Sequence, residues 1–211
     1  MVEKNNFTSL LERYLKNTLA KEQIEQMANY LLLMIKWNKV YNLTAIKEAK
    51  EMVIRHVLDS LAINDELKGS RIIDVGTGAG LPGIPLAIIN SDKHFSLLDS
   101  NNKKTRFLTQ VVIDLNLKNV EVISSRVENY SPDSCFDTVL TRAFGSINDM
   151  LLQTRHLCCR NGIFLAMKGV YPEEELNNLP KGFVVKSVKS MMVPELEAQR
   201  HCVTIEFAET E

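Results

Sequence analysis

A glycine-dense turn between two apolar runs constrains the fold of this chain more than any other part of its sequence. The stretch IIDVGTGAGLPGIPL, residues 72–86, places Gly78, Gly80 and Gly83 at the spacing G-x-G-x-x-G. That spacing is typical of the turn between the first strand and the first helix of a nucleotide-binding α/β sheet. Gly76 can adopt a positive φ there, and residues without a Cβ let a ligand approach the backbone closely. The turn therefore predicts a ligand site; the alternative is a turn that only packs a helix on a strand.

The apolar spacing of the chain changes at Gly69. Before it the spacing is helical, with Ile24, Met27 and Leu31 on one stripe. After it, short apolar or β-branched runs alternate with segments able to form helices, such as residues 104–117. The expected strands comprise residues 71–75, 94–98, 120–123, 136–140 and 162–167. Strands that alternate with helices indicate a parallel sheet covered on both faces.

The end of the chain breaks this alternation. Residues 183–193 and 201–208 are two further strand-like runs, with only PELEAQR between them. No helix fits in that gap, so the two runs are expected to pair as an antiparallel hairpin at a sheet edge. The predicted fold is therefore a Rossmann-like α/β domain, residues 69–211, with a mostly parallel seven-stranded sheet. A helical N-terminal extension, residues 1–68, is expected to precede it.

Charge and cysteine content limit the classes of partner. The 25 Lys and Arg residues nearly balance the 26 Asp and Glu residues, so any binding of a polyanion must be local. The four cysteines form no CxxC pair and no metal-ligand spacing, so we expect reduced thiols, no structural zinc, no bound metal and no disulfide framework. The sequence shows no signal peptide and no apolar run long enough to cross a membrane. We expect a cytoplasmic monomer.

A carboxylate after the second expected strand narrows the choice of ligand. Asp99 lies 23 residues after Gly76, where it can accept both ribose hydroxyls of an adenosine group. Asp74 extends the turn to D-x-G-x-G-x-G, and a carboxylate there suits a ligand with an ammonium and a sulfonium better than one with a pyrophosphate. No second mononucleotide-binding half follows. These features predict a class I S-adenosylmethionine-dependent methyltransferase, with an NAD-dependent oxidoreductase as the alternative.

The end of the fourth expected strand bears on the methyl acceptor. It reads FDTVLTRAF, without the Pro-Pro-aromatic pattern that usually grips exocyclic amines. Methylation at cytosine carbon needs a cysteine nucleophile, and none follows this strand. What remains is an acceptor with an accessible lone pair, such as guanine N7, or a small molecule. Such an acceptor needs no general base, because no proton has to be removed before attack.

Eight blocks of this sequence together resemble one bacterial family, the 16S rRNA guanine-N7 methyltransferases RsmG, also called glucose-inhibited division protein B or GidB. The resemblance runs from about residue 24 to residue 207. The blocks are WNKVYNLTAI, IRHVLDSLA, DVGTGAGLPGIPLAI, FSLLDSNNKKTRFL, SSRVENY, TRAF, LAMKG and VPELEAQRH. Two positions depart from the family pattern. Thr141 replaces the usual Ser, and Gln199 replaces the usual Glu, which removes a charge beside Arg200.

The resemblance implies methylation of a guanine N7 in the 530 loop of 16S rRNA, with S-adenosylmethionine as the methyl donor. The implied partner is 16S rRNA or a precursor of the small ribosomal subunit; a small molecule or a protein is the alternative acceptor. Carried over by motif, the implied cofactor contacts are Gly76, Leu81, Val127, Glu128 and Arg142. We add Gly78, from its place in the turn, and Asp99, from the ribose argument above.

Polar residues at the ends of expected strands are candidates for the acceptor site. Arg142 and Lys168 end the fourth and fifth expected strands, where open α/β sheets bind their ligands, and we expect them to orient the base. Expected contacts to RNA are Asn42, Arg55, His56, Lys103, Lys104, Arg200 and His201. For several of these a structural role is the alternative. Arg55 can pair with Asp59 four residues on, Asn42 can cap a helix, and the lysines can be solvated surface.

Overall fold

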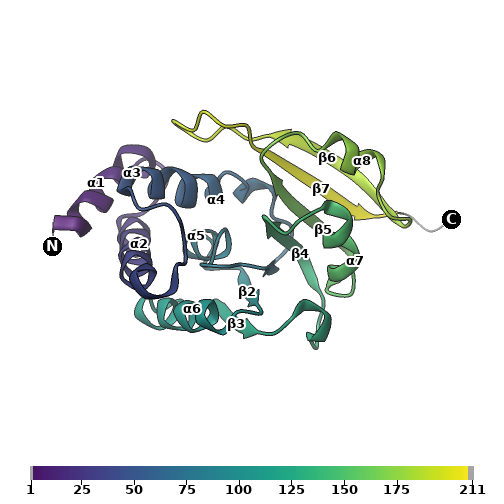
Figure 1. Ribbon diagram of the computed structural model, residues 1–211, viewed down its shortest axis with the longest axis horizontal. Coiled ribbons are helices and arrows are strands. Elements are labelled where there is room, and N and C mark those ends of the chain that lie inside the picture. The colour runs from purple at the N-terminus through teal and green to yellow at the C-terminus, as the bar shows by residue number, and fades with distance from the viewer. Residues whose placement is uncertain (1, 209–211) are drawn as a thin grey trace.

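The computed structural model of the chain describes residues 2–208, and within them seven strands form one sheet (Figure 1). The strands follow the order β3-β2-β1-β4-β5-β7-β6, and the first five of that order pair in parallel. β7 lies antiparallel to both β5 and β6. This confirms the Rossmann-like fold and the antiparallel hairpin at the sheet edge. The strand bounds are Arg71–Val75 (β1), His94–Asp99 (β2), Val120–Ser124 (β3), Phe136–Arg142 (β4), Cys158–Lys168 (β5), Phe183–Ser190 (β6) and His201–Phe207 (β7).

Helices cover both faces of the sheet. Because side chains alternate along a strand, Ile72 packs with one set of helices and Ile73 with the other. The α-helices are α1 (Val2–Leu15), α2 (Lys21–Tyr41), α3 (Ala49–Met52), α4 (Asp59–Leu61), α5 (Gly83–Ile89), α6 (Asn102–Asp114), α7 (Ile147–Thr154) and α8 (Glu173–Asn177). A π-helix, η1 (Val53–Leu58), joins α3 to α4, and short 3₁₀ turns lie at η2 (Asn64–Glu66) and η3 (Val127–Asn129). Figure 1 shows α1, α2 and α3 at one end of the molecule, and the loop between β6 and β7 reaches back to them, where Glu195 pairs with Arg13 and Lys50.

The N-terminal helices and the sheet share one apolar core. A single buried cluster contains Leu11 of α1, Leu31 of α2, Leu97 of β2 and Phe107 of α6. Tyr30 is fully buried in the same cluster, and its hydroxyl donates a 2.6 Å hydrogen bond to the carbonyl oxygen of Ala79. A buried tyrosine hydroxyl needs such a partner. α2 therefore supports the glycine turn directly.

Asp74 holds the glycine turn closed from inside. It is fully buried, and its Oδ2 accepts hydrogen bonds from Thr77 Oγ1 at 2.7 Å and from Gly83 N at 2.9 Å. Burial raises the pKa of this carboxyl to about 6, against the lowering effect of those two donors. We expected this carboxylate to face the ammonium group of a ligand, and the structure corrects that. Asp74 is turned into the protein, where it ties the end of β1 to the start of α5.

A disulfide joins Cys135 to Cys159, so the expectation that all four cysteines are reduced is wrong. The two residues are 24 positions apart, but Phe136 of β4 pairs with Cys158 of β5, which brings their neighbours together. Cys158 and Cys202 are buried free thiols, and burial raises the pKa of each to about 12. Within residues 2–208, no helix is long and apolar enough to cross a membrane, and no cluster of His, Cys, Asp and Glu is suited to a metal ion.

Candidate active site

Three adjacent pockets lie along the carboxyl ends of β2, β1, β4 and β5. The Asp99 pocket, about 310 Å³, is lined by Gly76, Asp99, Ser100, Lys104, Val127, Glu128 and Phe144, among others. The Gly78 pocket, about 270 Å³, shares Gly76 and Lys104 with the first and adds Thr44, His56, Gly78, Leu81 and Arg142. The Asp59 pocket, about 480 Å³, shares His56, Arg142 and Ala143 with the second and adds Arg55, Asp59, Lys168 and Arg200. The expected cofactor residues thus line the first two pockets, and both expected catalytic residues line the third.

The Asp99 pocket fits an adenosine group. Asp99 is buried, and its Oδ2 accepts a 2.9 Å hydrogen bond from Gly78 N while its Oδ1 accepts one from Asn101 N. A carboxylate has about four lone-pair sites, so it keeps acceptor capacity for ribose hydroxyls. Lys104 Nζ lies 3.7 Å from Asp99 Oδ2 and adds a positive charge between the Asp99 and Gly78 pockets. Val127 supplies a buried apolar wall suited to a base.

Gly76 lies at the junction of the Asp99 and Gly78 pockets, with φ at 70°. A Cβ there would lie 3.2 Å from Cδ2 of the Phe144 ring, which lines the same pocket. Phe144 is half-buried and packs beside the apolar core of the α7 face. The turn therefore leaves room at the place where a long ligand would pass from one pocket to the next.

Gly76→Ala is expected to weaken binding of S-adenosylhomocysteine by about tenfold, which corresponds to about 1.4 kcal/mol. The added methyl group would push against Phe144 and narrow the passage between the pockets. Isothermal titration calorimetry measures the affinity. Gly182→Ala is the matched control, because φ is 90° there and nothing lies within 4 Å of an added Cβ. Both variants carry the cost of a positive φ, so equal affinities in both would contradict the role of Gly76.

Asp59 binds two arginines from distant parts of the chain. Its Oδ1 accepts a 2.6 Å hydrogen bond from Arg200 Nε, and its Oδ2 accepts a 3.2 Å hydrogen bond from Arg142 Nη1. The Asp59 side chain is 5% exposed and both arginine side chains are 22% exposed. Arg142 Nη1 also donates to the carbonyl oxygen of Arg55. One buried carboxylate therefore fixes two guanidinium groups at the wall of the third pocket.

The pairing of Arg55 with Asp59, which the sequence offered as the alternative to a role in the site, does not form. Arg55 instead forms an ion pair with Glu51. The π-helix η1 contains Arg55 and ends just before Asp59, and Asp59 N bonds to the carbonyl oxygen of Ile54, five residues earlier. That wider turn changes which side chains share a face, and it directs Asp59 inward. Sequence reasoning therefore missed Asp59 as a member of the site, although a lone carboxylate within the apolar run of IRHVLDSLA was a usable signal.

Lys168 also lines the Asp59 pocket. Its Nζ donates 2.9 Å hydrogen bonds to both carboxylate oxygens of Glu175 and to the carbonyl oxygen of Gly145. Glu175 belongs to α8, which sequence reasoning did not include in the site. The ammonium group is therefore fixed in place and largely neutralised, while its side chain still lines the pocket.

His56 lines both the Gly78 and the Asp59 pockets as a neutral imidazole. Burial and, second to it, the nearby Arg142 charge together lower its pKa to about 4. Its Nε2 lies 2.9 Å from Thr44 Oγ1, whereas its buried Nδ1 has no hydrogen-bond partner within residues 2–208. The Nδ1 atom is therefore a buried polar group with unmet hydrogen-bonding capacity in the wall between the two pockets.

Some of the other expected RNA contacts line the Asp59 pocket, and the rest lie outside the three pockets. Arg55 and Arg200 line the Asp59 pocket together with His56. Lys103 is exposed, and its backbone N bonds to the side chain of Asn101 at the start of α6. His201 bonds to the carbonyl oxygen of Gly169, packs edge-on against Tyr171, and is not among the residues that line the three described pockets.

Asn42 lies beside a separate pocket, in the left-handed conformation that ends α2. Position 199 contributes only its carbonyl oxygen to Arg200, so the Arg200 ion pair does not depend on a Glu there.

A family model described as rRNA small subunit methyltransferase G, GidB, matches residues 23–203. The chain is 53% identical over 184 residues to the ribosomal RNA small subunit methyltransferase G of Aliivibrio fischeri, covering 87% of this chain and 88% of that one. It is 52% identical to the corresponding protein of Nitrosococcus oceani, covering 89% of this chain and 87% of that one. The chain belongs to the rRNA small subunit methyltransferase G family. It is therefore an S-adenosylmethionine-dependent methyltransferase, and the NAD-dependent oxidoreductase alternative is wrong.

Solved structures agree with this family assignment at the level of fold. An S-adenosylmethionine-dependent methyltransferase from Aquifex aeolicus aligns with a TM-score of 0.56 at 19% identity, covering 75% of this chain and 93% of that one. Coclaurine N-methyltransferase, bound to N-methylheliamine and S-adenosylhomocysteine, aligns with a TM-score of 0.57 at 14% identity, covering 90% of this chain and 66% of that one. The predicted class I methyltransferase fold is confirmed for this member of the methyltransferase G family.

Proposed function

We propose that this protein methylates N7 of a guanine in the 530 loop of 16S rRNA. The observation that carries the proposal is the Asp59 pocket, which adjoins the Gly78 pocket and presents Arg142 and Arg200 to an acceptor. A guanidinium can donate to guanine O6 and leave the N7 lone pair free to attack the methyl group. An RNA substrate follows from membership of an rRNA methyltransferase family.

The cofactor residues of the proposal line the first two pockets. S-adenosylmethionine, when bound, supplies an electrophilic methyl group. Asp99 accepts the ribose hydroxyls, and Val127 and Glu128 border the base. Gly76, Gly78 and Leu81 leave room for the remainder of the cofactor beside Arg142. These residues bind and orient; none of them has to react.

The acceptor residues of the proposal hold the guanine without acting as bases. Arg142 uses only Nη1 for its contacts within residues 2–208, so its Nε and Nη2 groups are available to donate to the base. Lys168, fixed by Glu175, also borders the base. Because N7 carries a lone pair and no proton, no general base is required. Well-oriented reactants gain roughly 7–11 kcal/mol from positioning alone.

The wider RNA contact surface is also part of the proposal. Residues 1–68 form the wall over the carboxyl ends of the strands that faces the RNA, while residues 69–211 bind the cofactor. The proposed phosphate contacts are Arg55, Lys103 and Lys104, and Asn42 and His201 are further proposed contacts to RNA. The enzyme acts in the cytoplasm as a monomer, on 16S rRNA or a precursor of the small subunit.

Chemical cleavage at N7-methylguanine in 16S rRNA tests the proposed reaction. RNA from cells that contain the gene should be cut at one guanine in the 530 loop, and RNA from cells that lack it should be intact there. Purified enzyme with labelled S-adenosylmethionine should restore the mark on RNA from the deleted strain. A small-molecule or protein methyltransferase would bind the same cofactor and leave both RNA samples identical, which would overturn the proposal.

A further inference from the structure

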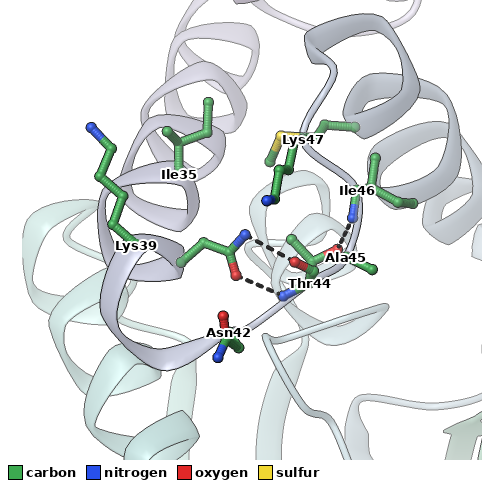
Figure 2. A pocket seen from close by; sticks show the side chains of 9 residues that line it. Ile35, Lys39, Asn42, Thr44, Ala45, Ile46 and Lys47 are labelled. Atoms are coloured by element: carbon green, nitrogen blue, oxygen red, sulfur yellow. Dashed lines mark hydrogen bonds between the residues drawn. The ribbon is translucent and has the colours of Figure 1, made fainter.

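A fourth pocket, about 700 Å³, lies beside the three that form the candidate active site. It is bounded by the end of α2 and by the segment that leads to α3, and we name it the Lys39–Lys47 pocket after two of its lining residues (Figure 2). Figure 2 shows Lys39 on one side of the pocket and Lys47 with Ile46 on the other. Its volume lies within the range of about 300–1,000 Å³ that is typical of small-ligand sites.

The walls of the Lys39–Lys47 pocket are fixed by hydrogen bonds. Asn38 Nδ2 donates to the carbonyl oxygen of Thr44 at 2.9 Å, and Asn38 Oδ1 accepts from Thr44 N at 2.9 Å, as drawn in Figure 2. Thr44 Oγ1 in turn accepts a 3.1 Å hydrogen bond from Ile46 N. Asn42, with φ at 50°, turns the chain at the end of α2. The pocket is therefore formed before any ligand binds, which lowers the entropic cost of binding.

The lining of this pocket is positively charged and partly apolar. Lys39 and Lys47 line it and no acidic residue does. Neither lysine forms an ion pair in the part of the chain that the structure describes. Ile35, Ile46 and Met52 supply an apolar surface between them. In a chain whose overall net charge is −1, this combination favours a ligand with both a flat apolar part and a negative charge.

The position of the pocket connects it to the reaction. It shares Thr44 with the Gly78 pocket and Ile46 with the Asp59 pocket, so only the segment Thr44–Ile46 separates it from the acceptor site. We propose that the Lys39–Lys47 pocket binds a second nucleotide of the RNA substrate, next to the one that is methylated. Its phosphate lies between Lys39 and Lys47, and its base packs against Ile35 and Ile46. This inference rests on the proposed RNA substrate and gives Asn42 a place in this second subsite.

Charge reversal in the pocket tests the inference on the full-length enzyme. The variants Lys39→Glu and Lys47→Glu are compared with Lys118→Glu, which changes the net charge equally. Lys118 is exposed and lies before the amino end of β3, whereas the pockets lie at the carboxyl ends of the strands. Each pocket variant is expected to raise KM for 16S rRNA from the deleted strain roughly tenfold and to lower the salt dependence of RNA binding by about one unit of log K per log salt. Fluorescence anisotropy with a labelled 530-loop RNA measures that slope without turnover.

The outcomes separate this inference from the proposed function. Affinity for S-adenosylhomocysteine and the melting temperature should be the same in all three variants, which shows that the fold and the cofactor site are intact. If the wild type methylates the RNA and the pocket variants match Lys118→Glu in both KM and salt slope, the second subsite is overturned while the function stands. If the wild type leaves the RNA unmethylated, the proposed function fails, and the subsite fails with it.

Discussion

Asp59→Ala is expected to lower the free energy of unfolding by about 2–3 kcal/mol and kcat/KM by about a hundredfold. The carboxylate is buried and neutralises Arg142 and Arg200 together. Without it, two guanidinium groups would be held side by side with no counter-charge. They would repel each other and move out of the acceptor site. Breaking a fully buried ion pair destabilises a protein by about 3–5 kcal/mol, and the loss of stability here should be smaller because both arginines reach solvent. Urea unfolding and steady-state kinetics measure the two effects.

Two further variants separate charge from shape at this position. Asp59→Asn keeps the size of the side chain and one carbonyl acceptor, so its losses should fall between those of the wild type and Asp59→Ala. Glu51→Ala breaks the exposed ion pair with Arg55 one turn earlier and should cost less than about 1 kcal/mol with unchanged activity. If Asp59→Ala behaved like Glu51→Ala, the two arginines would not depend on Asp59.

The fold could be predicted from the sequence because its signals are local. The spacing of apolar residues around Ile72 and Ile73 reflects which sheet face each side chain meets, and the glycine turn fixes where the first helix starts. The short gap between residues 193 and 201 allowed only a hairpin, and β6 and β7 form one. The Cys135–Cys159 disulfide depends instead on which strands become neighbours, so the spacing of cysteines in the sequence gave no indication of it.

The candidate site could be predicted only in part, for the same reason. Arg142 and Lys168 both line the third pocket, as expected of residues that end neighbouring parallel strands, because the carboxyl ends of such strands meet at one edge. Their partners Asp59 and Glu175 lie 83 residues before Arg142 and 7 residues after Lys168, in helices whose orientation the sequence does not reveal. In an α-helix, residues four apart lie on the same face, but the wider turn of the π-helix before Asp59 changes that spacing, so Asp59 does not face Arg55. The Lys39–Lys47 pocket could not be predicted, because it exists only where α2 meets the segment that follows it.

Arg142→Ala is expected to lower kcat by about 10²–10³-fold, the loss typical of removing one donor that stabilises a transition state. Arg142 lines both the Gly78 and the Asp59 pockets, so it lies where cofactor and acceptor meet. Stability should fall less than in Asp59→Ala, since Arg200 remains to neutralise Asp59. Arg142→Lys keeps the charge but loses the planar fork of donors, so it should restore stability more fully than turnover. Single-turnover methylation at saturating cofactor measures the chemical step.

Variants of Asp59 and Lys168 show whether Arg142 acts in the reaction or only stabilises the fold. A double variant lacking both Asp59 and Arg142 should be less destabilised than the sum of the single variants, because removal of the arginine relieves the repulsion created by removal of the carboxylate. Lys168→Ala should also lower turnover, but by less, since Glu175 already neutralises much of its charge. Full activity in both Arg142→Ala and Lys168→Ala would exclude these two residues from the reaction. The acceptor would then be oriented by Arg200, the other arginine that Asp59 holds in the wall of this pocket.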